Sequence, residues 1–184
     1  MKVPLLFGCN CIMNKPTEPN IIKACLAMVV SLEVAKLSPD PRKGVGATIF
    51  RTKSGLITSY SFNSKPTHSA NFHSCINEKT GMSQEDLGHA EVKAIVLGGL
   101  KQRTSRGNDS ISATSAPCVR CAGYIALSKM NHVYYLDPHD DLEGVRVLKE
   151  DYGIECTDLT PWLEYIHSLS DRAILTIESL GVPE

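Results

Sequence analysis

The second half of this sequence alternates between helical and strand-like segments, and that alternation limits the possible folds more than any other feature. Helices are predicted at 89–100, 117–130 and 142–152, and strands at 110–115, 132–136 and 154–157. Strands separated by helices of this length pair in parallel through right-handed crossovers, with the helices packed on the faces of the sheet. The pattern therefore predicts an α/β fold.

The first half supplies the remaining strands. Apolar residues recur at helical spacing over 21–37, and Asn20 is expected to cap this helix. Two runs rich in β-branched and aromatic residues, 45–50 and 56–62, are separated by a short Gly-containing turn and predict a hairpin. The polar segment 63–88 is expected to form a long loop over a site.

The chain is predicted to hold one domain with a short segment on each side. Its 184 residues fit the usual size of a single compact domain. Residues 1–20 are interpreted as a lead-in segment and 21–160 as the domain itself. Residues 161–184 are interpreted as a C-terminal helical extension that covers an edge or a subunit surface.

Charge and cysteine content indicate the cellular compartment of the protein and the partners that it binds. The chain has nineteen Lys and Arg against twenty Asp and Glu, so it has no overall basic field, and nucleic acid is not expected as a partner. Seven cysteines are an odd number, and two of them form a Cys-x-x-Cys, which predicts reduced thiols and a cytoplasmic protein. No apolar run has the length of a membrane span, so no membrane association is expected.

The string Pro117-Cys118-Val119-Arg120-Cys121 directly follows a predicted strand and begins a predicted helix. Residues three apart on a helix lie roughly 60° from each other, so Cys118 and Cys121 can bind one ion. A helix N-terminus also stabilises thiolates, because its N–H groups are unpaired. Taken alone, a Cys-x-x-Cys is more often part of a redox or structural zinc site than of a hydrolytic one.

A second string, His89-Ala90-Glu91, begins the preceding helix. In the first helical turn both side chains can reach a point beyond the helix end. One imidazole and two thiolates, from His89, Cys118 and Cys121, would give zinc three protein ligands and leave its fourth position for water. Such a zinc generates hydroxide at neutral pH, and Glu91 is placed to take and return the proton.

Both strings, in this order and at this spacing, match the signature of zinc deaminases. The sequence resembles the cytidine deaminase superfamily over residues 31–159, and most closely its deoxycytidylate (dCMP) deaminases. The resemblance is carried by 38–47 before and into the first strand, by Phe62-Asn63-Ser64-Lys65-Pro66, by His89 to Ile95, and by Thr114 to Ala122.

The resemblance implies a three-layer α/β/α fold, a mixed five-stranded sheet with a hairpin of the first two strands and parallel βαβ units. It also implies zinc on His89, Cys118 and Cys121, Glu91 as the proton shuttle, and Asn63 at the 3′-hydroxyl of a sugar. The family assembles into closed oligomers, and the C-terminal segment is apolar, so a homo-oligomer is expected. The sequence departs from the family motifs at Ser61, Ser64 and Lys93. The family's glycine loop takes part in regulation by nucleoside triphosphates, and Ser61 and Ser64 stand where that loop has glycines.

The sequence thus predicts zinc-dependent hydrolysis of dCMP to dUMP and ammonia, with a small-molecule nucleotide as the binding partner. One alternative is a deaminase of cytosine or adenine in single-stranded nucleic acid, or of another free base or nucleoside. It would need a local groove, for which Arg103, Arg106, Arg120 and Lys129 are candidates. A second alternative is a non-catalytic zinc or redox module.

Two further groups of residues are weaker candidates for binding. Arg42 and Lys43, just before the first strand, have the charge to bind a 5′-phosphate, although adjacent cations at such a place are more often part of a solvated rim. His68, His73 and Cys75 suggest a second zinc, but no fourth ligand follows from their spacing, and loop residues of this kind usually only cap turns.

Overall fold

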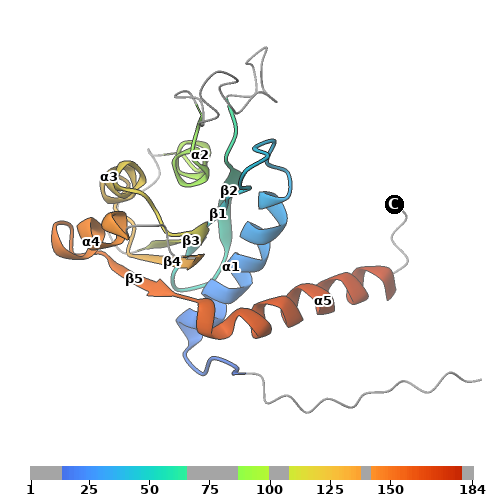
Figure 1. The fold of residues 1–184 in the computed structure, drawn as a ribbon. Coiled ribbons are helices and arrows are strands. Elements are labelled where there is room, and N and C mark those ends of the chain that lie inside the picture. Colours follow the sequence, from blue (N-terminus) through green and yellow to red (C-terminus); the bar gives the residue numbers. More distant parts are fainter. Residues whose placement is uncertain (1–13, 66–86, 100–107, 138–141, 180–184) are drawn as a thin grey trace, which may run out of the picture.

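A computed structural model of the chain describes residues 14–65, 87–99, 108–137 and 142–179, and the side chains of its last helix as far as residue 172. A five-stranded sheet lies at its centre, with the strand order β2-β1-β3-β4-β5 (Figure 1). The elements in chain order are α1 (Pro19–Ala35), β1 (Gly46–Arg51), β2 (Ile57–Phe62), α2 (Ala90–Leu97), β3 (Asp109–Ser115), α3 (Val119–Leu127), β4 (His132–Asp137), α4 (Glu143–Glu150), β5 (Glu155–Asp158), the 3₁₀ turn η2 (Thr160–Trp162) and α5 (Leu163–Ser179).

The strand pairing confirms the mixed sheet. β1 pairs antiparallel with β2, as a hairpin, and antiparallel with β3 on its other side. β3 and β4, and then β4 and β5, are parallel and are connected by α3 and α4. The predicted α/β class, the hairpin and the parallel βαβ units are therefore all present.

The two faces of the sheet carry separate hydrophobic cores, because successive strand side chains point to opposite sides. Figure 1 shows α2, α3 and α4 over one face and α1 and α5 over the other. The first core joins Ile95, Ile125 and Leu148 of the helices to Ile49, Ile111 and Val133 of the strands. The second joins Met28 of α1 and Ile166 of α5 to Phe50, Tyr134 and Leu136. Helix layers on both faces make the three-layer α/β/α arrangement.

The start of α1 differs from the prediction. Asn20 does not cap the helix, because the helix already begins at Pro19 and its N-cap residue is Glu18. Proline is well suited to the first helical position, where its missing N–H would have no partner in any case. Asn20 lies inside the first turn and accepts a hydrogen bond from Lys23 Nζ at 3.4 Å.

The predicted C-terminal helix is present as α5, after the short turn η2. Its first residues belong to the core of the domain, since Tyr165 and Ile166 are buried against the α1 face. Within the described residues no helix is long and apolar enough to cross a membrane. The division at residues 20 and 160 stays an interpretation of the sequence.

Candidate active site

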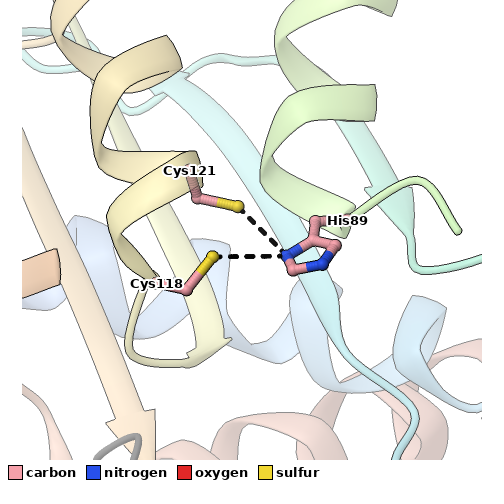
Figure 2. Close-up of side chains that lie close together, drawn as sticks. All are labelled: His89, Cys118 and Cys121. Atoms are coloured by element: carbon pink, nitrogen blue, oxygen red, sulfur yellow. Dashed lines mark hydrogen bonds between the residues drawn. The ribbon is translucent and has the colours of Figure 1, made fainter. Parts of the chain in front are cut away.

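Three side chains with metal-binding atoms converge where α2 and α3 begin. His89 is the N-cap residue of α2, Cys118 is the N-cap residue of α3, and Cys121 lies in the first turn of α3. His89 Nδ1 lies 3.6 Å from Cys118 Sγ and 3.3 Å from Cys121 Sγ (Figure 2). The three ligand atoms all lie within 4.8 Å of one another. The structure thus brings together the three residues that the sequence pattern singled out.

The backbone that carries Cys118 was predicted in a slightly different form. The helix was expected to begin at Pro117, but α3 begins at Val119, and Cys118 is extended with φ −73° and ψ 167°. The 60° separation on a helix therefore does not describe the two cysteines. The thiols converge because the chain turns into the helix at Cys118, directly after β3.

The donor set fits zinc. One imidazole nitrogen and two thiolates are the soft and borderline ligands that zinc prefers, and three of them leave its fourth position open. The hydrogen bond from Cys121 lowers the pKa of the Cys118 thiol to about 3. The same hydrogen bond, together with burial, raises the pKa of Cys121. A cation bound between the two sulfurs would stabilise both of them as thiolates.

Glu91 lies next to this cluster without belonging to it. Its side chain is buried, with 4 % of its surface exposed, in the first turn of α2. Burial raises the pKa of the Glu91 carboxyl, and hydrogen bonding with its own backbone and the nearby His89 act in the opposite direction. A carboxyl that is shielded from water and is not a ligand has the properties of a proton carrier.

A cavity of about 360 Å³ opens over these groups. Its lining brings together residues from five separate stretches of the chain: Asp40, Arg42, Lys43, Val45, Asn63, Leu87, His89, Ala90, Glu91, Ser115, Ala116, Cys118 and Asp137. The substrate-binding candidates Asn63, Arg42 and Lys43 thus share one cavity with Glu91 and two of the three metal-ligand candidates.

The amide of Asn63 is engaged by the segment that leads into β1. Its Oδ1 accepts a hydrogen bond from the Val45 N–H at 2.7 Å. Its Nδ2 donates to the Lys43 carbonyl at 2.9 Å and to Asp40 Oδ2 at 3.4 Å. Both N–H groups are in use, and the oxygen keeps one lone pair for a further donor.

The two cations at the cavity each face a carboxylate. Lys43 Nζ lies 2.5 Å from Asp137 Oδ2 and donates to Ser115 Oγ at 3.2 Å. Arg42 Nε lies 3.7 Å from Asp40 Oδ1. The Arg42 and Lys43 side chains are nearly half exposed, so both reach the solvent at the mouth of the cavity.

Three residues of this region were missed by the sequence reasoning. Asp137 is the last residue of β4, and Asp40 follows α1. Functional groups gather at the carboxyl ends of parallel strands, and this signal could have identified Asp137. Gly144 had no signal. A Cβ there would lie 1.9 Å from the Pro117 carbonyl oxygen, so only glycine lets α4 pack against the backbone that carries Cys118.

Some candidates lie outside the described residues or away from the cavity. His68, His73 and Cys75 are outside the described residues, as are Arg103 and Arg106. Arg120 and Lys129 are exposed and do not line the cavity.

The family described as "Cytidine and deoxycytidylate deaminase zinc-binding region" matches residues 22–137. A search of curated protein sequences found no significant match.

Solved structures share the fold at low sequence identity. A dCMP deaminase from the cyanophage S-TIM5, in complex with dCMP and dUMP, is 24 % identical, with a TM-score of 0.65 over 78 % of this chain and 99 % of that one. A Thermotoga maritima diaminohydroxyphosphoribosylaminopyrimidine deaminase/reductase is 20 % identical, with a TM-score of 0.56 over 86 % of this chain and 42 % of that one. A tRNA:A34 deaminase is 18 % identical, with a TM-score of 0.53 over 77 % and 98 %.

Proposed function

The chain belongs to the family of cytidine and deoxycytidylate deaminases, and we propose that its own reaction is the hydrolysis of dCMP to dUMP and ammonia. Membership makes it a zinc-dependent hydrolase, so the hypothesis of a redox or purely structural Cys-x-x-Cys module is set aside. The observation that carries the proposal is the convergence of His89, Cys118 and Cys121 beside the buried Glu91, at a cavity that His89, Cys118 and Glu91 line.

The residues of the site divide the chemistry between them. His89, Cys118 and Cys121 would hold the zinc, which supplies a Lewis acid that brings the pKa of a water molecule toward neutrality. Glu91 would accept a proton from that water and deliver it to the amine that leaves C4 of the cytosine. The amine departs as ammonia, and the oxygen of the water becomes the carbonyl oxygen of the uracil.

The cavity offers a group for each end of the sugar phosphate. The remaining lone pair of Asn63 Oδ1 can accept a hydrogen bond from a 3′-hydroxyl, and the backbone contacts of its amide hold it in place. Lys43 and Arg42 can bind a 5′-phosphate. Because exposed ion pairs contribute only about 0–1 kcal/mol, a phosphate dianion can replace Asp137 as the partner of Lys43.

The phosphate contact is tested by removing the charge of Lys43 and, as a control, the charge of a lysine that lies away from the cavity. Lys43→Met should lower the preference for dCMP over deoxycytidine, measured as the ratio of kcat/KM from ammonia release, by on the order of tenfold. Lys36→Met is the matched control, because Lys36 forms a similar exposed pair with Glu33, at 2.8 Å, away from the cavity. It should leave the ratio unchanged.

Two results would contradict the proposal that dCMP is the substrate. One is a wild-type protein that uses deoxycytidine and dCMP equally well. The other is a higher kcat/KM on cytosine in single-stranded oligonucleotides, which would favour the nucleic-acid alternative.

The 3′-hydroxyl contact is tested by changing the substrate. With 2′,3′-dideoxycytidine 5′-monophosphate in place of dCMP, kcat/KM of the wild type should fall. The fall should correspond to the free energy of a buried hydrogen bond, on the order of 1–3 kcal/mol. In Asn63→Ala the two substrates should differ much less, whatever that variant loses through its contacts with Val45 and Lys43. An equal difference in both proteins would show that Asn63 does not bind this hydroxyl.

The oligomeric state and the cellular location of the protein stay predictions. A homo-oligomer agrees with exposed apolar side chains on the neighbouring helices α2 and α3, among them Leu97 at 68 % and Leu127 at 78 % exposure. A cytoplasmic location rests on the cysteine content of the sequence.

A further inference from the structure

Lys93 lies in α2, one helical turn after His89, and contacts the loop that follows β2. Its Nζ donates a hydrogen bond to Ser64 Oγ and lies 4.9 Å from the centre of the Phe62 ring. Its methylene chain passes over Gly88, where a Cβ would lie 3.0 Å from Lys93 Cδ. A helical side chain points toward the N-terminus of its helix, which explains how Lys93 reaches back past His89.

The two residues held by Lys93 are joined to each other through their backbones. Ser64 N–H donates to the Gly88 carbonyl at 3.1 Å, and Gly88 N–H donates to the Ser64 carbonyl at 3.0 Å. Gly88 immediately precedes His89, and Ser64 immediately follows Asn63. This bridge therefore connects the neighbour of a metal-ligand candidate to the neighbour of a substrate-binding candidate.

The contact between Lys93 and Ser64 joins a charged donor to a buried acceptor. A hydrogen bond from an ammonium to a buried hydroxyl is stronger than a neutral one, and the face of an aromatic ring adds further attraction for the cation.

We propose that Lys93 is a positioning residue of the metal site. Its ammonium fixes Ser64, its methylene chain fixes Gly88, and together they set the backbone from which His89 reaches the metal. Groups that orient a ligand without binding the metal commonly change metal affinity by about 10–100-fold when they are lost. The inference concerns the metal and holds whichever base the enzyme deaminates.

The first test is Lys93→Met, which keeps a methylene chain over Gly88 and removes the ammonium. Zinc affinity, measured by competition with a chromophoric chelator, should fall about tenfold. The ligand-field absorption of the cobalt-substituted protein should shift, because His89 sits differently. Circular dichroism should show an unchanged fold.

Lys23→Met is the matched control for the loss of an ammonium. Lys23 Nζ donates to the carbonyls of Thr52 at 3.0 Å and Lys53 at 2.7 Å, in the turn between β1 and β2, at the end of the hairpin away from the site. This variant should melt at a lower temperature and keep the zinc affinity and cobalt spectrum of the wild type.

Ser64→Ala provides the second variant, and it decides the matter if Lys93→Met does not fold. It removes the acceptor of the Lys93 hydrogen bond, so it should lower zinc affinity in the same direction. The double variant should bind zinc about as well as the weaker single variant, because both changes break one contact. Wild-type zinc affinity in Lys93→Met or in Ser64→Ala would overturn the proposal. So would an equal loss of zinc in Lys23→Met, which would make the effect one of general stability.

Discussion

Glu91→Gln is expected to leave the chain folded and loaded with zinc while turnover falls by about 10²–10⁴. Glutamine has the size of glutamate, so the buried position of residue 91 stays filled. It cannot accept the proton of a water molecule and pass it on. Glu91 lies outside the cluster formed by His89, Cys118 and Cys121, so the metal should stay bound. Ammonia release, together with metal analysis of the same sample, measures both quantities.

Glu33→Gln is the control for the loss of a carboxylate. Glu33 is nearly half exposed on α1 and away from the cavity, and it should keep full turnover. Two results would contradict the role of Glu91. A variant that lost its zinc would make Glu91 part of the metal site, and a variant with near-normal turnover would remove it from the proton path.

The fold was predictable because its signals are local. Each helix and strand of the second half follows from apolar periodicity and from turn residues within a few positions. Gly153, with φ 63°, lies shortly after the end of α4, where the sequence predicted the stop. The prediction for Asn20 was wrong because two local signals compete there. Asn20 is a good capping residue, but Pro19 occupies the first helical position, which makes Glu18 the N-cap residue.

The site was predictable only in part. His89, Cys118 and Cys121 have a spacing typical of zinc ligands, so the sequence alone singled out the three residues that the structure brings together. The partners of Asn63 and Lys43 are set by contacts between distant segments: Asp137 meets Lys43 across the cavity, and 94 positions separate the two residues. The contact of Lys93 with Ser64 likewise depends on how the β2 loop packs against α2.

The purified chain is expected to contain one zinc, and Cys121→Ala is expected to lose it. Cys121 is fully buried, and its Sγ is 3.3 Å from His89 Nδ1, the shorter of the two sulfur contacts of that nitrogen. Two remaining ligands hold zinc far more weakly than three, because the binding free energy of the metal depends on its full ligand set. Metal analysis after dialysis should find well under half an equivalent in the variant and about one in the wild type.

Cys25→Ala separates the loss of a ligand from the loss of a buried thiol. Cys25 is also fully buried, in α1 on the opposite face of the sheet, and burial raises its pKa to about 12. Both variants remove one sulfur atom from a packed interior, so both should lower the melting temperature to a similar extent in the metal-free protein. Only Cys121→Ala should lose the stabilisation that added zinc gives, since a ligand that binds the folded state alone stabilises it in proportion to its affinity. Equal zinc contents in the two variants would exclude Cys121 from the metal site.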